Sequence, residues 1–322
     1  MMQAMRVHES GVLAYEQVPD PEPRPGEAVV ELKAAGLNRR DLLVQSGIYP
    51  FPLPLIPGSD GAGIRRDTGE EVVIYCGLGW GDREDAPAPG FEVLGGPRDG
   101  TYAELISLPE ENLFPKPAAL SWEEAAAFPL AALTAYRALF TRGQLQAGET
   151  VLVLGAGSGV STFVVQLAVQ AGARVVVTSS SDDKIERAKE LGAEGGVNYA
   201  RTEDWPTAVV ADLGPIDLVL DSVGSTWQDS LDAVRPGGRV VVFGGTGGTE
   251  VTLQVRPFYF KQQSLHGTQL GSPRDFEALL RMLEDATWRP VVDSVRPIAE
   301  AESALARMES GEHFGKLVLS IG

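Results

Sequence analysis

An uncharged, mostly apolar segment between Glu149 and Arg174 stands out in the hydrophobic pattern of the chain. Its length would suit a membrane-spanning helix, but a glycine cluster at residues 155–159 interrupts it. The apolar run before the cluster, residues 151–154, is short and rich in valine and leucine, which is typical of a buried parallel strand. We therefore predict several buried elements here and not a membrane span.

The residues after this cluster complete a β-α-β unit. Apolar positions recur at helical spacing over residues 160–171, and Gly172 is suited to the C-terminal end of a helix. A second valine-rich run follows at residues 174–178. Strand, glycine turn, helix and strand in this order form one supersecondary unit.

The same alternation continues to residue 267. Further strands are predicted at residues 197–199, 216–221, 238–243 and 264–267. Helices are predicted between them, at residues 181–191, 203–213 and 226–234. This order predicts an α/β fold with a doubly wound parallel sheet, whose ligands bind at the carboxyl ends of the strands.

The flanking segments have a different pattern. Proline and glycine separate the strand candidates before residue 121, which are residues 28–34, 71–75 and 101–106, and a last strand is predicted at residues 314–319. Ser121 followed by Glu124 resembles a capping box and predicts an alanine-rich helix to about Phe140. The predicted layout is a mainly β N-terminal domain, a nucleotide-binding domain and a C-terminal return.

The glycine turn is a candidate phosphate site. Glycine allows a tight turn and a close approach of the backbone to a ligand, and the helix behind it offers free N–H groups and the positive end of its dipole. Backbone contacts to a pyrophosphate would come from the residues of this turn, Gly155, Gly157, Ser158, Gly159 and Val160. The third glycine of the usual spacing is absent, and glycine turns also occur without ligands, so both interpretations stay open.

The end of the following strand bears on the choice of dinucleotide. A fold that selects NAD usually has an acidic residue here, bonded to the ribose 2′-hydroxyl. This chain has Thr178-Ser179-Ser180-Ser181 instead, followed by Asp182-Asp183-Lys184. Hydroxyl groups and a lysine can hold a 2′-phosphate, which favours NADP bound by Ser179, Ser180 and Lys184. The alternative is that a serine is the N-cap of the next helix, with acidic residues in its first turn. Both interpretations hold if one serine caps the helix and a neighbouring serine binds the phosphate.

Composition and charge narrow the function classes. The chain has 322 residues, enough for two domains, and a formal net charge of −17, which repels nucleic acid and anionic membranes. Its single cysteine, Cys76, excludes an intramolecular disulfide and a cysteine zinc cluster. The N-terminal residues have no apolar core of signal-peptide length, so we expect a cytoplasmic protein that acts on a small molecule.

Eight short motifs follow one another along the chain. They are AGLNRRD from residue 35, SGIYP from 46, PGSDGAG from 57, DGTYAE from 99, LAALTAY from 130, AKELGA from 188, DSVG from 221 and GKLVL from 315. In this order they resemble the medium-chain dehydrogenase/reductase superfamily, and most of all its zinc-free quinone oxidoreductase branch. The resemblance implies a Rossmann-type cofactor domain at residues 121–267 and a mainly β GroES-like domain made of residues 1–120 and 268–322. The family's glycine turn often ends in glycine where Ser161 stands.

Zinc-dependent members of this superfamily have a cysteine at the position of Asn38, His-Glu at the positions of Ser59 and Asp60, and a four-cysteine lobe. This chain has none of these, and its three histidines and one cysteine lie far apart in the sequence. Zinc prefers cysteine, histidine and carboxylate ligands, so no zinc site is expected.

The resemblance implies NADPH-dependent reduction of a quinone or of an activated alkene or carbonyl. Without a metal, hydride transfer depends on positioning and hydrogen bonds. Asn38 is expected near the nicotinamide and the substrate, and Tyr49 is expected to hydrogen-bond the substrate, with proton relay as a further role. The alternatives are a turn asparagine and a surface tyrosine before a proline turn.

Further site residues are implied by the same resemblance. Those expected at the cofactor are Thr134, Tyr199, Val223, Phe243, Gly244, Gly245 and Lys316, and those expected to wall the substrate pocket are Phe258, Tyr259 and Phe260. The alternatives are a Thr134 bonded to its own helix, a solvated Lys316 and an aromatic core cluster. Asp41 is expected to bond an arginine or cap a helix, Cys76 to be buried, and the three histidines to have no catalytic role.

Two other function classes stay open. The fold alone does not separate an enzyme from an NADP(H)-binding sensor or structural protein without turnover, and only the missing ligands disfavour a metal-dependent alcohol dehydrogenase. A homodimer is expected through the predicted strand near residues 264–269. The acceptor cannot be read from the sequence, because the shape of the pocket depends on loops such as residues 80–98.

Overall fold

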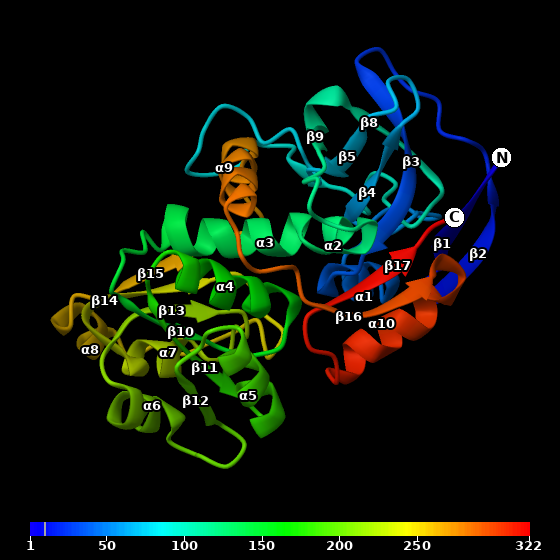
Figure 1. Ribbon diagram of the computed structural model, residues 1–322. Coiled ribbons are helices and arrows are strands. Elements are labelled where there is room, and N and C mark those ends of the chain that lie inside the picture. The colour runs from blue at the N-terminus through cyan, green and yellow to red at the C-terminus, as the bar shows by residue number, and fades with distance from the viewer. Residues whose placement is uncertain (10) are drawn as a thin grey trace. The chain divides into compact units, whose positions relative to one another are not determined.

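The structure, a computed structural model, describes residues 1–9 and 11–322, which form two compact units (Figure 1). The first unit comprises Met1–Ala131 and Ser272–Gly322, and the second comprises Ala132–Gly271. The first boundary lies inside helix α3 (Pro129–Tyr136), whereas the expected cofactor domain began at residue 121. Helix α2 (Trp122–Ala127) therefore belongs to the first unit. In the described ranges no helix is long and apolar enough to span a membrane.

The second unit is built on a six-stranded parallel sheet. Its strands are β10 (Thr150–Val153), β11 (Arg174–Ser179), β12 (Gly195–Asn198), β13 (Ile216–Asp221), β14 (Val234–Val242) and β15 (Ser264–Gly267). They lie in the order β12-β11-β10-β13-β14-β15, and every pairing is parallel. This is the expected Rossmann-type doubly wound sheet, and its switch point lies between β10 and β13.

Helices connect these strands (Figure 1). They are α4 (Gly159–Gln170), α5 (Asp182–Glu190), α6 (Trp205–Leu213), α7 (Trp227–Ala233) and α8 (Val255–Phe260). The first four were predicted and are confirmed, with small differences at their ends. Helix α8 was not predicted, because six residues give less than two turns of apolar pattern. The strand residues Leu152, Val176 and Val219 are fully buried, which explains why their runs are apolar without alternation.

A seven-stranded sheet forms the core of the first unit. Its strands are β3 (Glu27–Gly36), β4 (Asp60–Arg65), β5 (Glu71–Ile74), β8 (Leu105–Pro109), β9 (Leu113–Pro115), β16 (Val292–Pro297) and β17 (Lys316–Ser320). Strand β3 pairs antiparallel with β17, β4 and β8, whereas β16 and β17 are parallel. Two small sheets pair β1 (Met2–Glu9) with β2 (Val12–Val18), and β6 (Gly77–Leu78) with β7 (Glu92–Val93). The helices besides α2 are α1 (Arg39–Gln45), α9 (Pro273–Glu284) and α10 (Ala301–Ser310).

The strand predicted at residues 101–106 is wrong in its first half, because β8 begins only at Leu105. The backbone N–H groups of Thr101 and Tyr102 donate to the carbonyl oxygens of Gly58 and Pro57 at 3.1 and 3.0 Å. These donors are satisfied by an irregular segment and are not available to a strand ladder.

The helix predicted from Ser121 to about Phe140 is confirmed at its start and interrupted afterwards. The Ser121 Oγ accepts from the Glu124 N–H at 3.2 Å, and the Glu124 carboxylate accepts from the Ser121 N–H at 2.9 Å, which completes the capping box. Pro129 then opens a separate helix, α3, because proline has no N–H to continue the hydrogen-bond ladder of α2. The end of α3 passes into a π-helical turn, Arg137–Arg142.

Candidate cofactor and active site

The glycine turn after β10 lies at the switch point of the sheet and leads into α4. Gly155 and Gly157 have φ angles of +73° and +99°, in the left-handed region that favours glycine. Ser158 is the N-cap, and its Oγ accepts from the Ser161 N–H at 3.1 Å. The N–H groups of Gly159 and Val160, in the first turn of α4, have no intrahelical acceptor and can bind an anion such as a pyrophosphate.

Ser161 stands where the related turn often has glycine, and its side chain is used inside the turn. Its Oγ donates to the carbonyl oxygen of Ser158 at 3.0 Å and lies 3.0 Å from the Ser158 Oγ. The residue is buried. The serine therefore braces the turn and adds no group for a ligand.

The carboxyl end of β11 has three serines in different environments. Ser179 is buried, and its Oγ accepts from the Ser181 N–H at 3.2 Å. Ser181 caps α5, since its Oγ accepts from the Lys184 N–H at 3.4 Å. Ser180 lies exposed between them. The N-cap interpretation is confirmed for Ser181, and it leaves the Ser180 hydroxyl free for a ligand.

Arg201, which the sequence patterns did not single out, lies beside the same segment. The Asp182 carboxylate, in the first turn of α5, accepts from the Asn198 amide at 2.6 Å and pairs with Arg201 at 2.5 Å. The Tyr199 N–H donates to the Ser179 carbonyl oxygen at 3.0 Å, and the Tyr199 side chain is exposed. The signal was available, because Arg201 follows β12, whose carboxyl end lies next to that of β11 in a parallel sheet.

Asp221, the last residue of β13, organises the turn that follows. One carboxylate oxygen accepts from the N–H groups of Val223 and Gly224 at 2.8 and 3.2 Å. The other accepts from the hydroxyls of Thr226 and Ser230, both at 2.8 Å. This buried carboxylate holds Val223, an expected cofactor contact, in place.

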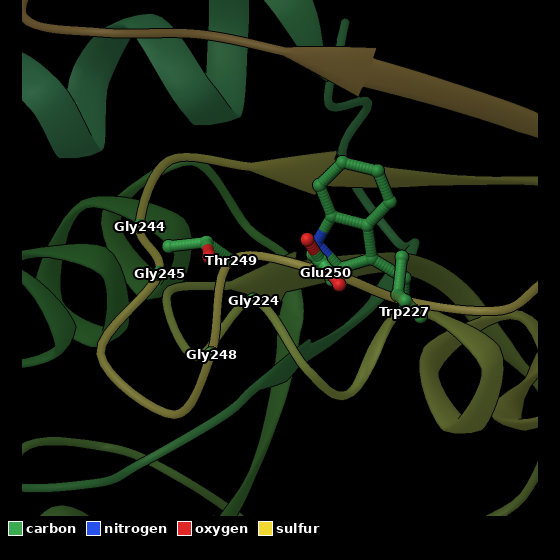
Figure 2. Close-up of a pocket in the computed structure, with 8 residues that line it drawn as sticks. Gly224, Trp227, Gly244, Gly245, Gly248, Thr249 and Glu250 are labelled. Carbon is green, nitrogen blue, oxygen red and sulfur yellow. The ribbon is translucent and has the colours of Figure 1, made fainter.

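The loop after β14 packs directly against that turn, and Figure 2 shows the pocket between them. A Cβ at Gly244 would lie 2.3 Å from the Ser222 carbonyl oxygen, and one at Gly224 would lie 2.5 Å from that of Gly248. Only glycine allows this approach. The pocket has a volume of about 670 Å³ and lies at the carboxyl ends of β13 and β14, where Phe243, Gly244 and Gly245 were expected to flank the cofactor.

Thr134 and the α8 aromatic residues also belong to the second unit. Thr134 is buried within α3. Phe258 packs against the core of this unit, whereas Tyr259 and Phe260 are 56% and 68% exposed and stack on each other at 4.9 Å between ring centroids. Of the three aromatic residues, only Phe258 fits the alternative of an aromatic core cluster. That the three residues form a wall of the substrate pocket stays a prediction.

The first unit brings together three residues that are far apart in the sequence: Asn38, Asp60 and Lys316. The Lys316 Nζ donates to the Asn38 Oδ1 at 2.7 Å and to the Asp60 Oδ2 at 3.1 Å, and the Asn38 Nδ2 donates to the same Asp60 oxygen at 2.9 Å. The other Asp60 oxygen accepts from the Leu130 N–H at 2.7 Å. Lys316 is 3% exposed and Asp60 is fully buried, so the solvated alternative for Lys316 is wrong.

The surroundings of this cluster are also polar and ordered. Asn38 is the N-cap of α1, and its backbone N–H donates to Asp41 at 2.8 Å, which confirms the structural role expected of Asp41. Asp41 also accepts from the Tyr102 hydroxyl at 2.8 Å. Burial raises the pKa of the Asp41 carboxyl, against the lowering effect of the nearby Arg40. The Arg40 guanidinium donates to the Ser59 Oγ at 2.7 Å.

Tyr49 and Cys76 lie in contrasting environments. The Tyr49 side chain is 41% exposed, and its ring packs edge-on against Phe51 with 6.2 Å between centroids. The exposure of Tyr49 agrees with the alternative of a surface tyrosine before a proline turn. It does not test whether Tyr49 contacts the substrate. Cys76 is buried as expected, and burial raises the pKa of its thiol.

The chain matches two family models. The alcohol dehydrogenase GroES-like domain matches residues 24–118, and the zinc-binding dehydrogenase model matches residues 159–285. A zinc-type alcohol dehydrogenase-like protein of Schizosaccharomyces pombe is 37% identical over 317 residues, which cover 92% of this chain and 91% of the relative. The chain belongs to the medium-chain dehydrogenase/reductase superfamily. The family inferred from the sequence motifs is confirmed.

Other members of the superfamily agree with this assignment. A quinone oxidoreductase of Pseudomonas aeruginosa is 34% identical, with 96% of this chain and 95% of the relative covered. A crystal structure of an NAD-dependent alcohol dehydrogenase superposes with a TM-score of 0.94 at 39% identity and full coverage of both chains. The protein is therefore an oxidoreductase of a family that binds NAD or NADP.

The second family model is that of a zinc-binding dehydrogenase, so the residues at the expected ligand positions are compared with the ligands that zinc prefers. In the part of the chain that the structure describes, no group of three His, Cys, Asp or Glu side chains is arranged to hold a metal ion. At the positions that match the zinc-ligand motif, Asn38 and Ser59 bond the cationic side chains of Lys316 and Arg40, and the one carboxylate, Asp60, is paired with Lys316. This donor set does not fit zinc, which prefers thiolate, imidazole and carboxylate.

Proposed function

We propose that this protein is a zinc-independent reductase that uses NADPH to reduce a quinone or an activated alkene or carbonyl compound. The Asn38–Asp60–Lys316 cluster carries the proposal, because an amide stands where zinc-dependent members have a cysteine ligand and it is bonded to an ammonium group. Such a cluster acts on an acceptor through hydrogen bonds and not through a Lewis acid. The similarity to a quinone oxidoreductase supports the acceptor class.

In this proposal Asn38 donates a hydrogen bond to the acceptor and Tyr49 supplies a proton. Bound NADPH supplies the hydride. The Asn38 amide, with one Nδ2 proton committed to Asp60, offers its second proton to the acceptor oxygen, where negative charge develops. Tyr49 gives a proton to the reduced acceptor, and its exposure lets solvent restore that proton.

The preference for NADPH rests on the segment after β11. The ribose 2′-position of a dinucleotide on this fold lies near Ser179 and Ser180, where a carboxylate would select NADH. Ser180 is exposed, and Lys184 follows in the first turn of α5. The Asp182 carboxylate, which would repel a phosphate, is neutralised by its pair with Arg201.

Steady-state kinetics test the proposed function directly. Oxidation of NADPH and NADH is measured with quinones, enals and aldehydes as acceptors, before and after treatment with EDTA. We expect kcat/KM for NADPH to exceed that for NADH by about tenfold or more, and we expect no loss after EDTA. A preference for NADH or a loss of activity with the chelator would contradict the proposal. Tight NADPH binding without turnover would instead support a sensor or structural protein.

A homodimer through the second unit is a further part of the proposal. Strand β15 is the last strand of the parallel sheet, and next to it in sequence α8 exposes Val255, Tyr259 and Phe260. An open strand edge beside exposed apolar side chains suits pairing with a second copy across a two-fold axis.

Light scattering tests this assembly. The wild-type protein is expected at twice the mass of one chain at micromolar concentration. Phe260→Glu puts a charge into the proposed interface and should raise the dimer dissociation constant by about tenfold or more. Val210→Glu, on the exposed face of α6, is the matched control and should leave the dimer intact. A monomeric wild-type protein would rule the dimer out.

A cytoplasmic location completes the proposal. Cys76 is buried and unpaired, and the chain has no other cysteine. This cysteine usage suits a reducing compartment.

A further inference from the structure

The ammonium group of Lys316 lies in a cage of three oxygen atoms. Its Nζ is 2.6 Å from the Leu37 carbonyl oxygen, 2.7 Å from the Asn38 Oδ1 and 3.1 Å from the Asp60 Oδ2. The three N–H groups of an ammonium are thus matched by three acceptors. The cage belongs entirely to the first unit, where β17 begins beside the end of β3.

The cage also determines which way the Asn38 amide faces. An ammonium only donates hydrogen bonds and a carboxylate only accepts them. The Asn38 Oδ1 must therefore face Lys316, and the Nδ2 must face Asp60, as the contacts of 2.7 and 2.9 Å have it. Rotating the amide by half a turn would set an NH₂ group against the ammonium and an oxygen against the carboxylate, which are two repulsive contacts.

We propose that the Lys316 ammonium is a resident cation that takes the place of a metal ion and holds Asn38 as a hydrogen-bond donor toward the acceptor. The inference rests on the proposed reductase function and extends it to a positioning residue and to the type of substrate. Lys316 itself does not touch the substrate. It acts by fixing the amide of Asn38.

Charge and chemistry favour an internal ammonium over a metal at this place. The Lys316 ammonium contacts one carboxylate, that of Asp60, and balances its charge within the buried cage. A second protein cation, the Arg40 guanidinium, bonds Ser59 and the Leu94 carbonyl oxygen at 2.7 and 2.5 Å. Both positions that lack their zinc ligand therefore carry a contact with a protein cation.

The orientation of Asn38 restricts the substrate. The remaining Nδ2 proton is a donor, so the group that it meets has to be an acceptor, such as the oxygen of a quinone, enal or enone. An alkene without a carbonyl oxygen offers no partner and would leave this donor unsatisfied. The substrate class is therefore narrowed to compounds that present a carbonyl oxygen at the reacting group, whether the hydride goes to the carbonyl carbon itself or to a conjugated double bond.

Lys316→Ala tests the proposal, because it opens a cavity that small primary ammonium ions can refill. Without added amine, we expect kcat with a carbonyl acceptor to fall by about ten- to a hundredfold, the effect of losing a hydrogen bond from a charged donor. Ethylammonium should restore part of kcat and raise the thermal unfolding midpoint of this variant. Tetramethylammonium carries the same charge without an N–H donor and should do neither.

Lys116→Ala is the matched control. Lys116 also has a buried side chain in the first unit, with oxygen contacts to Leu120 at 2.9 Å and Glu71 at 3.2 Å, but it has no contact with Asn38. Its kcat should stay at the wild-type value and should not respond to amines. Lys316→Met fills the same space without charge, so it should lose kcat and should not be rescued.

The double variant Lys316→Met/Asp60→Asn keeps the proposal testable if Lys316→Ala does not fold. It removes both charges and keeps the volume, and one amide oxygen still accepts at one of the two positions of the carboxylate, so the fold should be retained at reduced stability while kcat stays low. A wild-type kcat in Lys316→Ala or in the double variant would overturn the proposal, and so would equal rescue by tetramethylammonium. The unfolding midpoint needs no turnover, so a failure of the proposed reductase activity would remain distinguishable from a failure of the cation cage.

Discussion

Replacing Asp60 by alanine is expected to lower the free energy of unfolding by about 3–5 kcal/mol, the usual cost of removing one partner of a buried ion pair. Asp60 is fully buried, and its carboxylate accepts from Lys316, Asn38 and the Leu130 backbone at 2.7 to 3.1 Å. The variant would leave the Lys316 ammonium uncompensated and two further donors without their acceptor. Since domains are stable by about 5–15 kcal/mol, this would be a large fraction of the total.

Urea unfolding followed by circular dichroism measures this effect. Asp67→Ala is the control, because the Asp67 carboxylate is exposed and its pair with Arg65 lies at the surface, where loss of an ion pair changes stability little. Lys316→Met/Asp60→Asn should recover part of the lost stability, since neither buried charge remains and the new amide oxygen can accept from one of the two remaining donors. If Asp60→Ala unfolded at the wild-type urea concentration, the buried pair would not have the role described.

Ser180→Asp is expected to reverse the cofactor preference. A carboxylate at the end of β11 can bond the 2′-hydroxyl of NADH but repels the 2′-phosphate of NADPH. We expect kcat/KM for NADPH to fall by about a hundredfold, which corresponds to about 3 kcal/mol of repulsion and lost contacts. Because Ser180 is exposed and is not the N-cap of α5, the fold should tolerate the change.

The same acceptor assay, run with both dinucleotides, measures this reversal. Thr207→Asp adds an equal charge on the exposed surface of α6 and should leave the NADPH to NADH ratio unchanged. Were Ser180→Asp to keep the wild-type ratio, Ser180 would lie away from the 2′-position. In that case the segment from Ser179 to Lys184 would not determine the choice of cofactor.

Local patterns identified most of the fold. The valine-rich runs, the glycine turn and the serine caps each depend on residues within a few positions of one another. They can therefore be predicted from the sequence alone. The predicted strand at residues 216–221 coincides with β13, and Ser181 caps α5 as one interpretation required. The errors lie where the backbone donors of Thr101 and Tyr102 bond an irregular segment distant in sequence, and where Pro129 interrupts a helical pattern.

The sequence by itself determined the family, the Rossmann-type sheet and the residue types at the zinc positions. Only the tertiary structure decided what those residues do. Asn38 and Lys316 are 278 positions apart, and Asp60 and Lys316 are 256 apart, yet β3 and β17 pair and bring them within hydrogen-bond distance. No local pattern encodes such a contact, because it arises from strand pairing between the two ends of the chain. A lysine that looked equally suited to solvent or to a cofactor is thereby buried as the counter-ion of Asp60.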